Sequence, residues 1–317
     1  MEEIGQRSIK KIFRFASSYL KTFGFLLRNK YDRCYIAITC HGSGFLKDAP
    51  FVLACKMFGR KVILHQHNKG MSSDVNRPLY RWLLRLVYGG SKVVLLSQHL
   101  YPDIQEIVSK EQVMVCPNGI PFDIPHSETT TKNSHTSVIL FLSNLMESKG
   151  VITVFDACRI LKDRGYKFEC RFVGGETAEI DKNRFINETT SRDIEEMVVY
   201  VGKKYGDEKN KEFSNADIFV FPSYDDCFPL VILEAMQHSL PIVCSNEGGI
   251  PDIIDNDETG IIVPPKDPVI LANAISQLLD SPQRRDELGR KANEKFISNF
   301  TLRKFEENML ACLTSPI

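Results

Sequence analysis

Two carboxylates, Asp226 and Glu234, stand eight residues apart on either side of Pro229. On one continuous helix this spacing would separate them by roughly 12 Å along the helix axis. Proline suits the first turn of a helix, because its missing N–H has no intrahelical partner there. Pro229 therefore predicts that a helix starts between the two acids, with Asp226 in the preceding loop and Glu234 inside the helix. Both carboxylates can then border one pocket.

The segments around this pair follow the order strand, loop, helix, strand. Apolar strands are expected at 218–221 and 241–244, with a helix at about 230–238 between them. This order is typical of a parallel α/β sheet, in which ligands bind at the carboxyl ends of the strands and helix N-termini favour anions. The loop that carries Asp226 occupies such a position. A solvated loop acid and a surface helix acid remain the simpler interpretations of the two carboxylates.

The stretch 219–265 resembles a known family. It reads FVFPSYDDCFPLVILEAMQHSLPIVCSNEGGIPDIIDNDETGIIVPP. Over some forty residues it is similar to the E-x7-E region of the retaining glycosyltransferases of family 4, with Asp226 in place of the first Glu. The resemblance implies that Glu234 holds the ribose hydroxyls of a nucleotide-sugar donor. It also implies that Asp226, with backbone groups near Phe228 and Leu230, holds the hydroxyls of the sugar.

A second motif, FLSNLMESKGV at 141–151, ends a predicted strand and starts a helix. In the family, an Arg and a Lys in this loop bind the donor diphosphate. Lys149 matches the Lys, whereas Asn144 stands where the Arg is expected. An ammonium group offers phosphate a point charge, but an amide offers only neutral hydrogen bonds. A surface lysine at a helix start is the alternative interpretation of Lys149.

The motif HQHN at 65–68 follows a predicted strand of the first domain. By resemblance, His67 is the histidine that faces the transferred sugar, which places it in the catalytic set with Asp226 and Lys149. A packed or surface histidine is the alternative, and His65 is assigned to the strand end. H-x-H spacing also suggests a metal, but no carboxylate–histidine set accompanies it, so no metal site is expected.

Two glycine-containing loops, VGGET at 173–177 and VGK at 201–203, follow strands of the second domain. The resemblance places Gly174 and Gly202 around the nucleotide base, where backbone groups make the contacts. Both can equally be turn glycines. The sequence has no G-x-G-x-x-G or Walker-type loop, which argues against a dinucleotide-binding or kinase function.

Composition sets the class of protein. Of 317 residues, 43% are hydrophobic and 25% charged, as in soluble globular proteins. The 40 basic residues balance the 40 acidic ones, so the net charge does not indicate a nucleic-acid partner. No apolar run approaches the roughly eighteen residues of a membrane span. Nine cysteines, an odd number without a C-x-x-C pair, indicate buried thiols in a reducing compartment, so a cytoplasmic protein is expected.

Strand-like and helical runs alternate along the whole chain and predict two α/β domains. Strands are expected at 35–39, 61–65, 93–97, 112–116, 138–142, 169–173, 198–201, 218–221, 242–244 and 261–263. Helices are expected at 7–30, 49–58, 79–87, 101–108, 151–162, 230–238, 269–279, 282–296 and 301–313. The layout resembles the GT-B fold, two doubly wound Rossmann-like domains facing a cleft.

The expected domains are an acceptor-side N-terminal domain, a linker, a nucleotide-sugar domain and a final helix that crosses back to the first domain. Their bounds are 1–125, 126–136, 137–297 and 298–317. Family members normally begin with a strand, a Gly-rich turn and a helix before the region that corresponds to residues 8–40. The resemblance therefore implies that the N-terminal domain is incomplete.

The resemblance implies a retaining glycosyltransferase that moves a sugar from a UDP- or GDP-linked donor to a hydroxyl acceptor. Surface polysaccharide or lipid-linked glycan synthesis is the expected context. No metal and no cofactor are expected, since Lys149 and the start of the 230–238 helix take the cation's place. The basic helix at 7–30 is expected to pack on the sheet, or in addition to contact an anionic membrane surface. The alternative function is a catalytically inactive fold used for binding or scaffolding.

Overall fold

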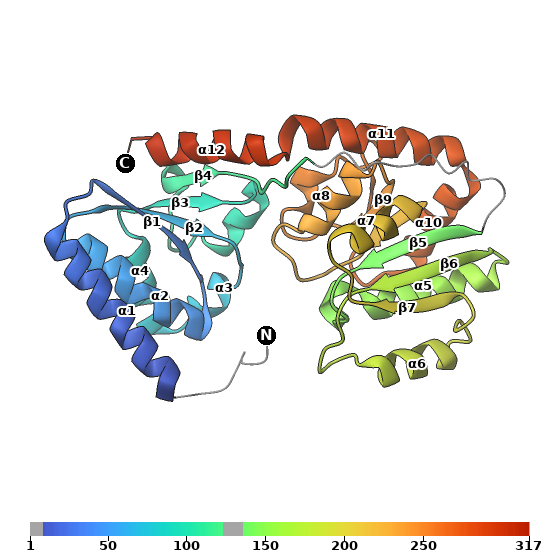
Figure 1. The fold of residues 1–317 in the computed structure, drawn as a ribbon, viewed down its shortest axis with the longest axis horizontal. Coiled ribbons are helices and arrows are strands. Elements are labelled where there is room, and N and C mark those ends of the chain that lie inside the picture. Colours follow the sequence, from blue (N-terminus) through green and yellow to red (C-terminus); the bar gives the residue numbers. More distant parts are fainter. Residues whose placement is uncertain (1–8, 123–135, 317) are drawn as a thin grey trace. The chain divides into compact units, whose positions relative to one another are not determined.

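The computed structural model describes residues 9–122 and 136–316 (Figure 1). The chain divides into a first unit, Met1–Cys116 with Asn308–Ile317, and a second unit, Pro117–Glu307. Apart from Thr136, the predicted linker at 126–136 lies outside the described residues.

The first unit is built on a parallel sheet with the strand order β1-β2-β3-β4. The strands are β1 (Arg33–Ile38), β2 (Lys61–Gln66), β3 (Lys92–Leu95) and β4 (Val113–Val115). The α-helices before β4 are α1 (Ile9–Arg28), α2 (Gly42–Met57), α3 (Met71–Asp74) and α4 (Pro78–Tyr88). The two central strands are nearly continuous buried apolar runs, whereas β1 at the edge alternates between exposed and half-buried positions.

The second unit is built on a larger parallel sheet with the strand order β10-β9-β8-β5-β6-β7. Its strands are β5 (Ser137–Leu142), β6 (Phe168–Val173), β7 (Val198–Gly202), β8 (Ile218–Phe221), β9 (Ile242–Ser245) and β10 (Ile261–Val263). Its helices include α5 (Val151–Asp163), α6 (Lys182–Ser191), α7 (Gly206–Asn215), α8 (Leu230–Gln237), α9 (Ile250–Ile253), α10 (Pro268–Asp280) and α11 (Pro282–Asn299). The last helix, α12 (Leu302–Thr314), runs from the second unit into the residues grouped with the first.

The strand order of the second unit changes direction at β5. The chain builds β5, β6 and β7 on one side of the sheet and then crosses to add β8, β9 and β10 on the other side. Adjacent β5 and β8 are parallel, with Ile139 opposite Ile218, so their carboxyl ends open at the same edge. Such a topological switch point is where open α/β sheets bind ligands.

An aromatic cluster holds the β5–β6 side of this sheet. The ring centroid of Phe172 lies 4.9 Å from that of Phe141, 5.0 Å from that of Phe155 and 5.3 Å from that of Phe185. All four side chains are buried. Because they come from β5, β6, α5 and α6, their packing holds these elements rigidly together beneath the loops that follow the two strands.

All ten predicted strands are present, but two predicted helices are wrong in extent or type. Helix α2 begins seven residues earlier than expected, at Gly42, because the Asp74 carboxylate accepts a hydrogen bond from the Gly42 N–H at 2.7 Å. The segment expected as a helix at 101–108 instead forms a 3₁₀ helix at Gln98–Asp103 followed by turns. There Asp103 accepts hydrogen bonds from the backbone of the α3 start.

Two further helices of the second unit, α6 and α7, were not predicted. Their sequences, KNRFINETTS and GDEKNKEFSN, contain few apolar residues and so lack the periodic apolar face that identifies a helix from sequence. Both helices bear directly on the candidate site.

Candidate functional site

The predicted phosphate residue Lys149 and the predicted sugar residue Asp226 form an ion pair. The Lys149 Nζ lies 2.8 Å from the Asp226 Oδ2 and also donates a hydrogen bond to the Asp225 carbonyl at 2.6 Å. The side chains are 21% and 18% exposed. Lys149 follows β5 and Asp226 follows β8, so the two adjacent strand ends bring together residues that are 77 positions apart in the sequence.

Backbone contacts hold these two loops together. The Tyr224 N–H and the Ser223 hydroxyl both donate to the Ser148 carbonyl, at 2.9 Å and 3.1 Å. Gly150 has φ +86°, and a Cβ on it would lie 2.4 Å from the Pro222 carbonyl oxygen. Only glycine therefore lets the Lys149 loop approach the β8 loop this closely.

The loop that carries Asp226 is also pressed against the segment after β9. Gly248 has φ +53°, and a Cβ there would lie 2.2 Å from the Asp226 carbonyl oxygen. The Gly249 N–H donates to the Cys227 carbonyl at 2.7 Å. Gly248 therefore avoids a steric clash with the loop, and Gly249 supplies a hydrogen bond to it.

Asn144, the residue that replaces the expected Arg, makes a local structural contact. Its Oδ1 accepts a hydrogen bond from the Gly175 N–H at 3.2 Å, and the Leu145 N–H donates to the Gly175 carbonyl at 2.7 Å. The Thr177 hydroxyl donates to the Leu145 carbonyl at 2.5 Å. The amide therefore fastens the loop after β5 to the loop after β6, and its contact with a donor phosphate stays a prediction.

The two predicted base-contacting glycines are in conformations that favour glycine. Gly174 has φ +157°, and a Cβ on it would lie 1.7 Å from the Ser143 carbonyl oxygen. Gly202 has φ +84°, with open space around its Cβ position. The Gly174 N–H donates to the Gly202 carbonyl at 2.9 Å. Close packing accounts for Gly174 without a ligand, and the base contact remains a prediction for both.

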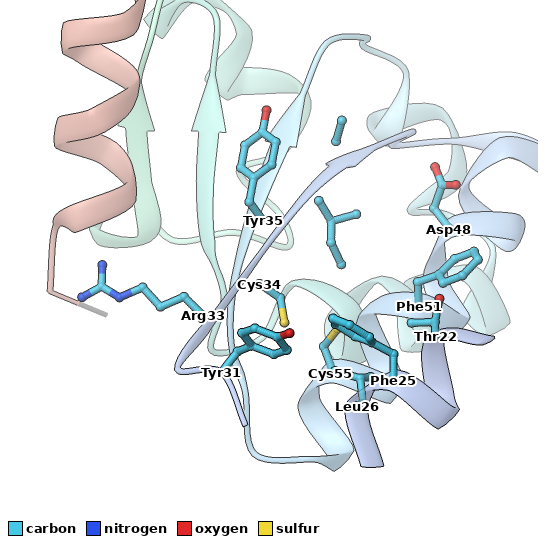
Figure 2. A pocket seen from close by; sticks show the side chains of 12 residues that line it. Thr22, Phe25, Leu26, Tyr31, Arg33, Cys34, Tyr35, Asp48, Phe51 and Cys55 are labelled. Atoms are coloured by element: carbon cyan, nitrogen blue, oxygen red, sulfur yellow. The ribbon is translucent and has the colours of Figure 1, made fainter. Parts of the chain in front are cut away.

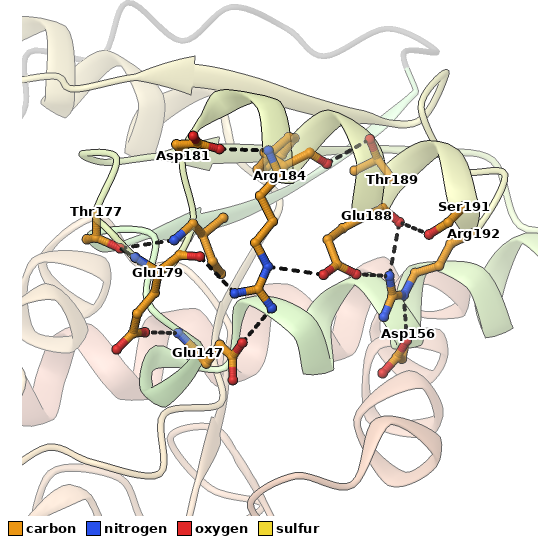
Figure 3. A network of polar contacts seen from close by, with 12 residues as sticks. Glu147, Asp156, Thr177, Glu179, Asp181, Arg184, Glu188, Thr189, Ser191 and Arg192 are labelled. Carbon is orange, nitrogen blue, oxygen red and sulfur yellow. Dashed lines mark hydrogen bonds and ion pairs between the residues drawn. The ribbon is translucent and has the colours of Figure 1, made fainter.

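A charged network braces the Lys149 loop from the side of α6 (Figure 3). The Arg184 guanidinium lies 2.5 Å from the Glu147 carboxylate and 3.2 Å from the Glu188 carboxylate. The Glu147 N–H donates to the Glu179 Oε2 at 3.1 Å, and Arg192 pairs with Glu188 at 2.6 Å. Hydrogen bonds from the Arg192 and then the Arg184 guanidinium lower the pKa of Glu188. Since Glu147 is two residues from Lys149, the network restricts the loop that carries the ammonium group.

Glu234, the second acid of the motif, lies inside α8 as predicted. Its Oε1 is 2.6 Å from the Nζ of Lys209 on α7. Its Oε2 is buried and has no hydrogen-bond partner in the described part of the chain. Lys209 was not identified from the sequence, because its helix carries no apolar pattern that would have placed it.

Phe228 and Leu230 flank Pro229 at the start of α8. Phe228 is buried and packs edge-on against Phe300, with ring centroids 6.0 Å apart. Leu230, the first residue of α8, is 45% exposed. The Phe228 side chain therefore anchors the loop, while the predicted donor contacts of the two backbones stay predictions.

His67 belongs to the first unit, whereas the other predicted site residues belong to the second. It is exposed and follows β2. Its ring lies 4.0 Å from that of the buried His65, whose Nδ1 is 2.6 Å from the Tyr35 hydroxyl. Burial lowers the pKa of His65, and partial desolvation of the His67 ring lowers the pKa of His67. Among residues 9–122 and 136–316, no three His, Cys, Asp or Glu side chains come together as a metal site.

The buried His65 predicts a loss of stability in acid. Burial, with a smaller contribution from His67, lowers the pKa of His65 to about 4. The unfolded chain therefore binds more protons than the folded chain between about pH 6.5 and 4. The free energy of unfolding accordingly decreases by roughly 3 kcal/mol as the pH falls through this window. Urea denaturation of the wild type and of His65→Gln at pH 7 and pH 4.5 checks this. The variant should lose less stability between the two pH values; an equal loss would assign the acid sensitivity to other groups.

The first unit contains a separate, largely apolar pocket of about 590 Å³ (Figure 2). It lies between the helices α1 and α2 and the edge strand β1. Its walls include Phe25 and Leu26 of α1, Phe51 of α2 and Tyr35 of β1. None of the sequence-predicted site residues lines it.

Comparison with known proteins identifies the family. A family model described as "Glycosyl transferases group 1" matches residues 124–295, more than half of the chain. D-inositol 3-phosphate glycosyltransferase of Corynebacterium diphtheriae is 31% identical over 170 residues, which cover 53% of this chain and 40% of the relative. Amylovoran biosynthesis glycosyltransferase AmsK of Erwinia amylovora is 34% identical over 146 residues, which cover 44% of this chain and 35% of the relative. The chain thus matches less than half the length of these relatives.

Solved structures match the fold over nearly the whole chain. Anabaena Alr3699/HepE has a TM-score of 0.81 at 18% identity, covering 95% of this chain and 82% of that protein. Sucrose-phosphate synthase from Thermosynechococcus elongatus has a TM-score of 0.77 at 17% identity, covering 97% and 79%. The predicted GT-B class, with two Rossmann-like parallel-sheet domains, is confirmed. With the family model spanning the loops that carry Asn144, Lys149, Asp226 and Glu234, the chain belongs to the group 1 glycosyltransferases.

Proposed function

We propose that this chain is a retaining glycosyltransferase that transfers a sugar from a nucleoside-diphosphate sugar to a hydroxyl acceptor. One observation carries the proposal: Lys149 and Asp226 meet at the carboxyl ends of the adjacent strands β5 and β8. Glu234 follows in the helix that starts from the same loop. A cation for phosphate and two acceptors for hydroxyls are the groups that a nucleotide sugar requires.

In the proposed reaction, the bond between the sugar C1 and the terminal phosphate oxygen breaks while the acceptor oxygen bonds to C1 on the same face. The leaving phosphate takes the acceptor proton, so no separate base is required. Lys149 stabilises the negative charge that develops on the diphosphate, and electrostatic stabilisation of this kind is often the largest single contribution to catalysis. Asp226 orients the sugar through its hydroxyls. The mechanism assigns no step to a metal ion or a cofactor.

The Lys149–Asp226 ion pair must open when a donor binds. In this structure the ammonium group is neutralised by the carboxylate that is expected to bind the sugar. A phosphate that displaces the carboxylate from Lys149 releases Asp226 for the sugar hydroxyls. Binding of the diphosphate and formation of the sugar subsite are thereby coupled.

The acceptor is proposed to be a glycan or a lipid-linked glycan. The named relatives include an enzyme of amylovoran biosynthesis. The first unit offers an apolar pocket, and α1 exposes apolar side chains, among them Leu20 and Leu27, beside basic ones. This arrangement suits peripheral contact with an anionic membrane at its inner face. None of the helices that the structure describes is long and apolar enough to cross a membrane.

A nucleotide-binding fold without transfer activity is the second candidate. It is favoured by Asn144, which replaces the arginine expected to bind the phosphates. The Asn144 amide oxygen instead accepts a hydrogen bond from the Gly175 N–H. Such a protein would bind the nucleotide, but in the presence of acceptors it would not release nucleoside diphosphate from a nucleotide sugar.

The test is a thermal-shift screen of UDP, GDP and the corresponding monophosphates, with EDTA in every well. HepE has been solved in complex with UDP and with UDP-glucose, which makes UDP the first probe. A ligand at 100 times its dissociation constant adds about 2.7 kcal/mol of stability. We expect one diphosphate to raise the melting temperature more than its monophosphate does, in EDTA. Stabilisation that appears only when manganese or magnesium is restored would refute the metal-free mechanism, and no stabilisation by any nucleotide would refute the function.

A further inference from the structure

Helices α7 and α8 contact each other at two matching positions. The Lys209 Nζ lies 2.6 Å from the Glu234 Oε1. Four residues further along the chain in each case, the ring of Phe213 on α7 stacks on the ring of His238 at the end of α8, with centroids 5.1 Å apart and planes at 23°. Residues at i and i+4 share one face of a helix. The two contacts therefore fix the register of α7 against α8.

The Phe213–His238 contact does not depend on Lys209. Phe213 is fully buried and its ring also lies 5.7 Å from that of Phe219 on β8. The His238 ring is tied to its own helix, with Nδ1 2.8 Å from the Glu234 carbonyl oxygen. Burial lowers the pKa of His238. These contacts should hold α7 against α8 when the Lys209 charge is removed.

Only one oxygen of the Glu234 carboxylate has a partner in the described part of the chain. Lys209 and Glu234 are largely buried, with 26% and 22% of their side chains exposed. Oε1 pairs with the ammonium group, while Oε2 is buried without a partner among the described residues. A buried acceptor without a donor is unfavourable, and native proteins normally supply one from the chain, water or a ligand. A ligand hydroxyl placed at Oε2 would complete the carboxylate.

We propose that Lys209 is a positioning residue for nucleotide recognition: it holds Oε1 of Glu234 and compensates its charge, so that Oε2 is presented to a ribose hydroxyl of the donor. This inference rests on the proposed function, in which Glu234 meets the ribose. Without the ammonium group, the carboxylate is free to rotate and its charge is uncompensated in a largely buried place. The site should then distinguish poorly between a ribose and a sugar that lacks the hydroxyls.

The experiment compares UDP with 2′,3′-dideoxyuridine diphosphate by titration calorimetry, with GDP and its dideoxy form as a second pair. The variants are Lys209→Met, Lys209→Arg and a matched control, Lys211→Met, which removes an exposed lysine of the same helix. A hydrogen bond to a charged group changes affinity by about tenfold or more. We expect the wild type and Lys211→Met to prefer the ribose form by at least this factor. Lys209→Met should lose the preference and Lys209→Arg should recover most of it.

The ratio of the two affinities separates positioning from a general structural role. A purely structural Lys209 would lower the melting temperature of Lys209→Met and weaken both ligands equally, leaving the ratio unchanged; that result would overturn the inference. If Lys209→Met does not fold, Lys209→Gln takes its place, with the same expected loss of the ratio. A wild type that binds the ribose and dideoxy forms equally would also overturn the inference. A wild type that binds no nucleotide at all would instead refute the proposed function itself.

Discussion

Replacing Lys149 with methionine is expected to weaken binding of a nucleoside diphosphate by roughly 1.5–3 kcal/mol, about ten- to a hundredfold. Methionine keeps most of the side-chain volume but removes the charge that the proposed mechanism assigns to the phosphates. Sugar transfer should slow by a further factor of about 10²–10³, because the charge is needed most when the leaving group departs. Calorimetry with UDP or GDP, and release of the diphosphate from the nucleotide sugar selected by the thermal-shift screen, measure the two effects.

The control for Lys149→Met is Lys182→Met, which removes an exposed lysine at the start of α6 in the same unit. It should change neither binding nor transfer. The free nucleoside should bind both variants as it binds the wild type, since it carries no phosphate. Equal weakening of nucleoside and diphosphate would show that Lys149 acts through the loop rather than through the phosphates.

Asp226→Asn is expected to strengthen the binding of a nucleoside diphosphate but to slow sugar transfer. The Lys149 ammonium group lies 2.8 Å from the Asp226 carboxylate, so a diphosphate must compete with this carboxylate. Removing the competing charge should tighten diphosphate binding by about 1 kcal/mol, roughly fivefold, as for a partly exposed ion pair. Transfer should nevertheless fall about ten- to a hundredfold, since the sugar loses a charged acceptor for its hydroxyls.

Asp226→Glu is the matched variant for this experiment, because it keeps the charge and restores the residue type that is usual in the family. It should retain transfer within a few fold and should not tighten diphosphate binding. The same calorimetry and release assay apply. If Asp226→Asn weakens diphosphate binding or leaves transfer unchanged, the exchange of partners at Lys149 does not take place, and the 2.8 Å pair is structural only.

Much of the fold followed from local sequence patterns. The apolar runs of β2, β3 and β8 predict buried parallel strands because both faces of such strands are covered, and all ten strands were found. Pro229 predicts the start of α8 one residue later, since proline suits the beginning of a helix. The meeting of Lys149 and Asp226 did not follow from local patterns, because it requires β5 and β8 to be neighbours in the sheet, and the sequence did not predict that order.

The residues that support the site could be identified only from the tertiary structure. Lys209 and Arg184 lie on α7 and α6, two polar helices without an apolar period, and each pairs with an acid 25 or more positions away in the sequence. The start of α2 is likewise set by Asp74, 32 residues distant from Gly42. The periodicity of apolar residues shows which face of a segment is buried, and it is visible within that segment. The partner of a charged or capping residue lies in a distant segment, so only the folded structure identifies it.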